Sequence, residues 1–122
     1  MSATRSDHAP PAASGVREIE PASVARTQGV HLVDVREPHE LAGELGRIAG
    51  VDRVPLATLD AAAARWDKDA DIVLICRSGN RSSRAAELLA RQGFRRVFNM
   101  TGGMLAYAAA GLPLQRDQEP PP

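Results

Sequence analysis

The chain alternates short apolar runs with segments whose apolar residues recur at helical spacing. The two clearest runs, residues 31–36 and 71–75, are rich in β-branched residues, which is typical of buried strands. Two shorter runs, 16–19 and 96–98, predict further strands, the first of them at an edge of the sheet. Strands that alternate with helices through short connections predict an α/β fold, with an open, mostly parallel central sheet flanked by helices on both faces.

Helix signals fill the spaces between these runs. Proline suits the first position of a helix, so Pro21 and Pro38 predict two short helices. Thr58 is a candidate N-cap for a third helix over 59–66, whose apolar face includes Trp66. The remaining expected segments are a long glycine-marked loop over 43–54, a helix that begins near Arg81 and is ended by Gly93, and a helix over 104–110.

The totals describe one ordinary soluble domain. Of the 122 residues, 43% are hydrophobic, and fifteen basic residues balance fifteen acidic ones, so no global field favours nucleic acid. No apolar run is long enough to span a bilayer and no signal-peptide core is present, so we expect a cytoplasmic protein without a membrane partner. Residues 1–15 and 117–122 are expected to be a disordered leader and tail around a domain over 16–116. The totals leave the oligomeric state open between a monomer and a weak dimer.

The only cysteine of the chain, Cys76, stands where the strand over 71–75 ends and a tight loop begins. Gly79 permits backbone angles that other residues resist, so the N–H groups of residues 77–82 can turn toward the sulfur. With a single cysteine, neither an internal disulfide nor a resolving cysteine on the same chain is available. The loop is therefore predicted to be an anion cradle that contains a nucleophile.

Positive charge around this cysteine favours its reactive form. A helix begins directly after the loop, and its N-terminus carries the positive end of the helix dipole. No acidic residue stands between Cys76 and Glu87, whereas three basic ones do: Arg77, Arg81 and Arg84. Both effects favour the thiolate. The alternatives are a structural cysteine, which needs neither arginines nor a glycine turn, and a nest that binds anions without covalent chemistry.

Three stretches together resemble the rhodanese family of sulfurtransferases. Their order and spacing match from about residue 16 to residue 115, and they are Leu32-Val33-Asp34-Val35-Arg36, Cys76-Arg77-Ser78-Gly79-Asn80-Arg81-Ser82 and Gly102-Gly103-Met104-Leu105-Ala106-Tyr107. Residues 47–55 also resemble the family's loop of the form G-H-I-P-G-A-x-x-I-P, with Arg47 and Ala49 in place of its histidine and proline. Tyr107 stands where a tryptophan is common.

The resemblance implies an enzyme that moves a sulfane sulfur from thiosulfate, or a related donor, through a persulfide to a thiol, cyanide or protein acceptor. It requires no metal or organic cofactor. It implies a catalytic role for Cys76 and a supporting role for Asp34 and Arg36. The substrate-binding positions that it implies are Arg77, Ser78, Gly79, Asn80, Arg81 and Ser82. Among these, Arg77 stands where a basic residue favours thiosulfate over a carboxylate-bearing donor, and Arg81 where it could bind the sulfonate end.

Two other classes of protein share parts of this pattern. A cysteine-dependent phosphatase or arsenate reductase also places a cysteine and an arginine in a loop before a helix. Its signature has one residue more between them than the four that separate Cys76 from Arg81, and the shorter loop suits a single sulfur atom better than a phosphoryl group. A non-catalytic binding module would be expected to lack the cysteine. A sulfur-relay protein would share the whole site, so the sequence leaves that alternative open.

Overall fold

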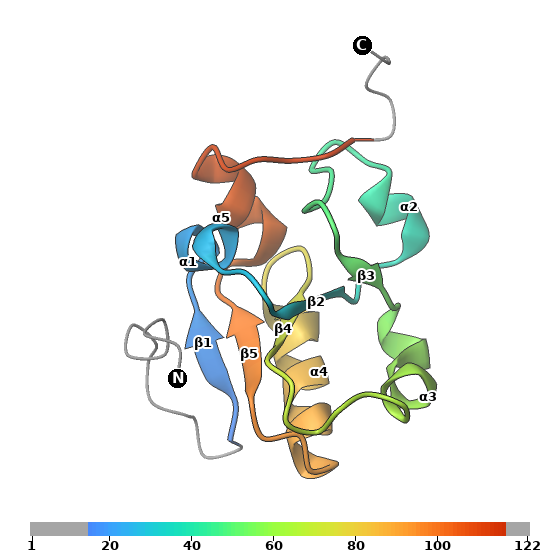
Figure 1. Ribbon diagram of the computed structural model, residues 1–122. Helices are drawn as coiled ribbons and strands as arrows, with labels where there is room; N and C mark the ends of the chain where they lie inside the picture. Colours follow the sequence, from blue (N-terminus) through green and yellow to red (C-terminus); the bar gives the residue numbers. More distant parts are fainter. Residues whose placement is uncertain (1–14, 117–122) are drawn as a thin grey trace.

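The computed structural model describes residues 15–116, so the predicted leader and tail lie, apart from residue 15, outside the described residues. Within this range one sheet of five parallel strands has the order β1-β5-β4-β2-β3 (Figure 1). The predicted α/β fold is confirmed, and the first strand lies at an edge. The strands are β1 (Arg17–Ile19), β2 (His31–Asp34), β3 (Asp52–Arg53), β4 (Ile72–Ile75) and β5 (Val97–Met100).

Helices cover both faces of the sheet, as predicted. Val24 of α1 and Tyr107 of α5 share one buried cluster, and Leu59 of α3 and Leu89 of α4 share the other. No helix within residues 15–116 is long and apolar enough to cross a membrane. The helices are α1 (Pro21–Arg26), α2 (Pro38–Leu41), α3 (Leu59–Ala63), α4 (Asn80–Arg91) and α5 (Gly103–Ala109), and a 3₁₀ turn (Leu56–Thr58) precedes α3.

The segment predicted as one long loop over 43–54 contains the short strand β3. Asp52 pairs with Val33 of β2, and Arg53 pairs with Asp34. Both β3 residues are exposed and charged, so their composition carries no strand signal. They adopt strand geometry because the neighbouring strand offers its free edge to them, which a local pattern does not report.

The prediction of a helix over 59–66 extended too far, because α3 ends at Ala63. Thr58 precedes α3 without capping it, because its hydroxyl donates to a preceding carbonyl oxygen instead. The N–H of Trp66 donates to the Ala63 carbonyl oxygen, three residues earlier, at 3.0 Å. This turn lets the indole pack edge-on against the His31 ring, with 4.5 Å between the ring centroids.

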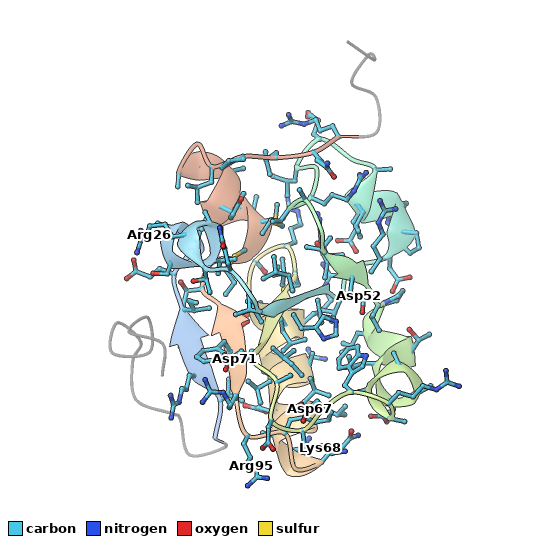
Figure 2. The ribbon with its side chains drawn as sticks, viewed as in Figure 1. Arg26, Asp52, Asp67, Lys68, Asp71 and Arg95 are labelled. Atoms are coloured by element: carbon cyan, nitrogen blue, oxygen red, sulfur yellow. The ribbon has the colours of Figure 1, made fainter. Side chains whose placement is uncertain are left out.

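The parallel arrangement gives the sheet two chemically different ends. Asp67, Lys68 and Arg95 gather at one end, away from α2 and α5, beside the starts of β4 and β5 (Figure 2). At the other end, the carboxyl ends of β2, β4 and β5 lead into α2, α4 and α5. In open parallel sheets this carboxyl edge is where ligands bind.

Candidate active site

Cys76 is the first residue after β4, which is buried along its whole length between β5 and β2. The cysteine side chain is only 1% exposed and belongs to the core cluster beneath α4. The start of the loop is therefore fixed by the most constrained strand of the sheet. Its end is fixed as well, because Asn80 opens α4 immediately after Gly79.

The loop closes around the sulfur atom. The N–H groups of Gly79 and Ser82 donate to Cys76 Sγ at 3.1 and 3.3 Å, and Ser82 Oγ lies 3.2 Å from it. Gly79 has a φ of +103°, a conformation that favours glycine, and this residue turns the chain into α4. The predicted cradle is present, although fewer of the six N–H groups of residues 77–82 hydrogen-bond to the sulfur than the sequence suggested.

These contacts set the ionisation of the thiol. Burial raises the pKa of Cys76, but hydrogen bonding with the Ser82 side chain and from the N–H groups of Ser82, Gly79 and Ser78 outweighs it. The pKa of Cys76 is therefore lowered from its ordinary value of 9.0. The causes are local dipoles, since hydrogen bonds to the charged form of a group favour that form. These contacts favour the thiolate form of Cys76.

The outward side of the loop is tied to α5. The carbonyl oxygen of Cys76 accepts from the N–H of Met104 at 2.8 Å, and that of Arg77 accepts from the N–H of Leu105 at 3.0 Å. Gly103 makes this approach possible, because a Cβ there would lie 2.4 Å from the Arg77 carbonyl oxygen. With its carbonyl groups bound to α5, the loop is held with N–H groups toward the sulfur.

A buried ion pair lies at the end of β2. Arg36 donates to both carboxylate oxygens of Asp34, with Nη2 at 2.8 Å from Oδ2, and both side chains are almost fully buried. The same Nη2 donates to the carbonyl oxygen of Gly46 at 2.8 Å. The pair thus holds the segment that follows α2, and it supports the wall facing the Cys76 loop rather than that loop itself.

Arg81 is bound by a carboxylate from the same wall. Its Nη1 and Nη2 donate to the two oxygens of Glu40 in α2, at 2.7 and 2.8 Å. The Arg81 guanidinium and the N–H of Glu37 lower the pKa of Glu40 to about 2, against the opposing effect of burial. The pair is therefore ionised at neutral pH, and Arg81 is not a free cation.

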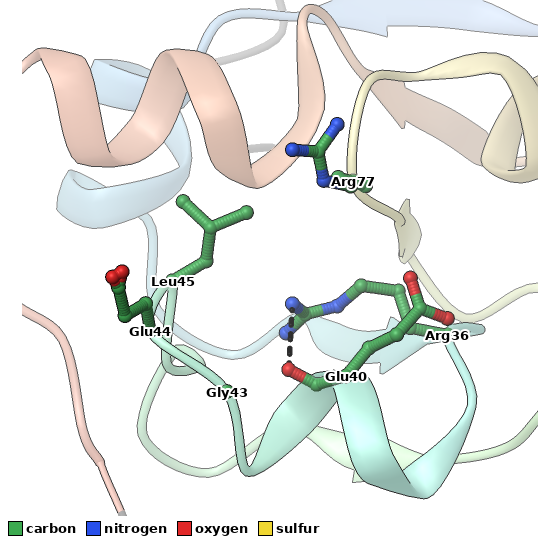
Figure 3. A pocket seen from close by; sticks show the side chains of 6 residues that line it. All are labelled: Arg36, Glu40, Gly43, Glu44, Leu45 and Arg77. Atoms are coloured by element: carbon green, nitrogen blue, oxygen red, sulfur yellow. Dashed lines mark hydrogen bonds between the residues drawn. The ribbon is translucent and has the colours of Figure 1, made fainter.

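A pocket of about 220 Å³ opens beside the loop, between α2 and the residue that follows the cysteine (Figure 3). Arg77 is exposed, makes no ion pair with any residue in 15–116, and lies across the pocket from Glu40. Cys76 is not among the residues that line the pocket, which lies beside the cradle and is joined to it by Arg77, the residue after the cysteine. The residues that line the pocket are Arg36, Glu40, Gly43, Glu44, Leu45 and Arg77.

Known proteins are similar to this chain in sequence. Residues 22–110 match the model of the rhodanese-like domain. A sulfurtransferase of Allochromatium vinosum is 41% identical over 91 residues, which cover 75% of this chain and 83% of that protein. This chain belongs to the rhodanese-like domain family.

Two further comparisons agree with this assignment. Thiosulfate sulfurtransferase GlpE of Ectopseudomonas mendocina is 36% identical, covering 69% of this chain and 75% of that protein. The crystal structure of a rhodanese-related protein from Thermoplasma volcanium superposes with a TM-score of 0.72 at 30% identity, covering 80% of this chain and 96% of that one. Three other relatives are longer, and this chain spans half of their length or less.

The residues predicted to bind the substrate differ in their contacts with the sulfur of Cys76. Ser82 and Gly79 contact the sulfur, and Ser78 acts on it only through its N–H, since its side chain is exposed. Asn80 is also exposed and begins α4 without a hydrogen bond to the sulfur. Within residues 15–116, no group of three or more His, Cys, Asp or Glu side chains could hold a metal ion.

Two residues of this site, Asn99 and Glu40, were not assigned to it from the sequence. Asn99 in β5 lies beyond the predicted strand over 96–98, and its Oδ1 accepts from the Ser82 hydroxyl at 2.5 Å. A polar residue in an otherwise apolar run was its only signal. Glu40 stands three residues after Glu37 and forms a helix capping box with it. Its second role, toward Arg81 from 41 residues away, has no sequence signal.

Proposed function

We propose that this rhodanese-like domain is a sulfurtransferase that takes a sulfane sulfur from thiosulfate and carries it as a persulfide on Cys76. The observation that carries the proposal is the convergence of main-chain N–H groups, those of Gly79 and Ser82, on Cys76 Sγ. Such a cradle stabilises negative charge on sulfur, first as the thiolate and then as the persulfide anion. The similarity to proteins named as sulfurtransferases supports the same reading.

The reaction proceeds in two displacements. In the first, the Cys76 thiolate attacks the outer sulfur of thiosulfate; a new S–S bond forms, the old one breaks, and sulfite leaves with the bonding electron pair. In the second, an acceptor nucleophile attacks the outer sulfur of the persulfide and regenerates the thiolate. Cyanide then gives thiocyanate, and a thiolate gives a new persulfide. No net oxidation occurs, and one difficult transfer becomes two easier ones.

Arg77 is the residue that we assign to the anionic end of the donor. It follows the nucleophile directly, lines the pocket and makes no ion pair with the rest of residues 15–116. A guanidinium binds oxyanions through paired N–H groups, which suits the three oxygens of the sulfonate end and of the departing sulfite. The acceptor that we propose is a thiol, free or on a partner protein, and no further cofactor enters the reaction.

A phosphatase reading is disfavoured by the state of Arg81. A cysteine-dependent phosphatase needs the arginine of its loop to hold the phosphoryl oxygens. Here both terminal nitrogens of Arg81 are engaged by the Glu40 carboxylate. The loop's N–H groups, moreover, point at the sulfur atom itself and leave no cradle for a larger group.

The mass of the protein tests the proposal directly. After incubation with thiosulfate and desalting, the wild type should gain the mass of one sulfur atom, lose it on addition of cyanide, and release thiocyanate. Cys76→Ser should show neither change. A wild type that gains no sulfur from thiosulfate or from any other sulfane-sulfur donor would overturn the proposed function, and hydrolysis of p-nitrophenyl phosphate dependent on Cys76 would favour the phosphatase.

The role of Arg77 has its own test. Arg77→Ala should raise the KM for thiosulfate, while the free energy of unfolding changes by less than about 0.5 kcal/mol, as is usual for an exposed side chain without partners. Steady-state kinetics and urea denaturation measure the two quantities. A lowered stability with unchanged kinetics would show that Arg77 is structural.

A further inference from the structure

The pairing of Arg81 with Glu40 changes the charge that a donor meets. Glu40 reaches the loop from α2, and its two oxygens take both terminal nitrogens of Arg81. The carboxylate is further fixed by the N–H of Glu37, which donates to its Oε2 at 2.9 Å. The orientation of Glu40 is therefore set by its own helix before the arginine binds, and the paired charges cancel.

The same cancellation holds for the other charged pair at the pocket. Arg36 lines the pocket, but its guanidinium is bound by Asp34. The carboxylate of Glu44 lies on the opposite side of the pocket from Arg36, at the exposed rim (Figure 3). Arg77 therefore lines the pocket as a cation that forms no ion pair with a carboxylate of residues 15–116, and it directly follows Cys76 in the chain.

This balance discriminates between donors by charge. Thiosulfate is a dianion, whereas a thiosulfonate or an organic persulfide carries one negative charge beside the same kind of transferable sulfur. One unpaired guanidinium can neutralise a monoanion, but a dianion leaves a second charge near the thiolate. Repulsion between like charges costs free energy that bulk water screens only in part at a half-enclosed site.

We propose that Glu40 is a specificity-determining residue that holds Arg81 away from the donor and so shifts this site's preference from dianionic toward monoanionic sulfur donors. The inference rests on the proposed sulfurtransferase function and concerns which donor that function favours. Glu40 acts through Arg81, without contacting the reacting sulfur, and is therefore a positioning residue. Its effect is expected on the ratio of kcat/KM values for two donors that differ by one charge.

Thiosulfate and methanethiosulfonate are suitable probes. The second presents a methyl group in place of one charged oxygen, and its reaction with Cys76 releases methanesulfinate instead of sulfite. Glu40→Gln removes the charge but keeps the side-chain acceptor that glutamine also supplies at this capping position. It should raise the ratio of thiosulfate to methanethiosulfonate kcat/KM by roughly three- to tenfold, mainly through the KM for thiosulfate, and added salt should shrink the rise.

Arg81→Gln provides the opposite change, because it leaves the Glu40 charge unpaired. It should lower the ratio. The double variant carries two neutral glutamines in place of the ion pair, so its ratio should return to within about twofold of the wild-type ratio. This ordering is a signature of charge: a loss of packing would lower the rates with both donors together and leave their ratio unchanged. If Glu40→Gln proves unstable, the sign of the Arg81→Gln effect still tests the proposal.

Glu44→Gln is the matched control. It also removes a carboxylate from the lining of this pocket, but that carboxylate is not paired with an arginine of the Cys76 loop. It should change the ratio less than Glu40→Gln does. An unchanged ratio in Glu40→Gln, or an equal rise in Glu44→Gln, would overturn the assignment. Either result, obtained while methanethiosulfonate still loads sulfur onto Cys76, would leave the proposed function standing; failure of every donor to load sulfur would remove both.

Discussion

The sulfur cradle and the wall that faces it across the pocket are built from different kinds of groups. The cradle stabilises the sulfur of Cys76 with backbone N–H groups, and the Ser82 hydroxyl oxygen lies 3.2 Å from it. The wall contributes charged side chains: Asp34 is bound to Arg36 within the wall, and Glu40 of the wall is bound to Arg81 of α4. Dipoles thus act on the reacting atom, while full charges are placed where they determine which molecule reaches it.

The two regions also depend differently on the amino-acid sequence. Main-chain groups are present whatever side chain a position carries, so the cradle depends mainly on where glycine allows the backbone to turn or to approach. The wall depends on particular pairs, since a buried charge without its partner is strongly unfavourable. Substitutions should therefore damage the wall through charge and the cradle through shape.

The largest expected effect is in the wall. Asp34→Asn leaves the Arg36 guanidinium buried without a counter-charge and should lower the free energy of unfolding by about 3–5 kcal/mol. Urea denaturation at neutral pH measures this change. The same substitution at Asp52, which pairs with His31 and has a half-exposed side chain, is the control and should cost less than about 1 kcal/mol. Equal losses at both positions would mean that burial of the Asp34–Arg36 pair contributes nothing special.

Much of the fold was predictable because its signals are local. The β-branched run over 72–75 and the prolines that open α1 and α2 each express a preference of their own segment. Strand β3 carries no such preference and exists through its pairing with β2. Its absence from the prediction reflects a tertiary contact overriding an uninformative composition.

The candidate site divides in the same way. Cys76 and Gly79 could be predicted from the sequence, because a lone cysteine beside a glycine turn and the start of a helix has few structural roles. The partner of Arg81, in contrast, lies on another helix, and a sequence does not state which carboxylate the fold will bring to a given arginine. The arginine predicted to face the donor is consequently held by Glu40, and Arg77 is left unpaired within residues 15–116.

A smaller loss is expected where the cradle rests on α5. At Gly103, with a φ of +60°, an added Cβ would lie 2.4 Å from the Arg77 carbonyl oxygen and 2.6 Å from that of Cys76. Gly103→Ala should therefore cost about 2–4 kcal/mol of stability and displace the loop. Gly111→Ala is the control for backbone strain without a steric clash, because the φ of Gly111 is +72° but nothing lies within 4 Å of the added Cβ. It should cost only about 1–2 kcal/mol.

The two glycine variants also differ in their expected chemistry. Gly103→Ala should slow persulfide formation even under conditions where the protein remains folded, because the N–H groups of the loop no longer point at the sulfur. Gly111→Ala should leave the rate unchanged. Intact-mass measurement of sulfur loading gives both rates, and a normal rate in a folded Gly103→Ala variant would show that α5 does not position the cradle.

The smallest effect on stability, and the most specific one on chemistry, is expected at Ser82. Ser82→Ala removes the hydroxyl beside Cys76 Sγ and the donor to Asn99, at a cost of about 1 kcal/mol. The backbone N–H of residue 82 remains, so the pKa of Cys76 should rise relative to the wild type without reaching the value that burial alone would give. The pH profile of alkylation by iodoacetamide should move upward accordingly.

The sign of the linked stability follows from the same shift. A thiol whose pKa is lowered by folding contributes stability that is fully present above its unfolded value and disappears as the pH falls through the folded value. In Ser82→Ala the folded-state pKa of Cys76 rises toward the unfolded value, so the thiolate contributes less stability. Wild type and variant should therefore differ more in unfolding free energy at high pH than at pH 6. Ser83→Ala, one residue further along α4, should alter neither profile. A Ser82→Ala variant with an unshifted alkylation profile would assign the low pKa to the backbone alone, and the cradle would then owe nothing to any side chain.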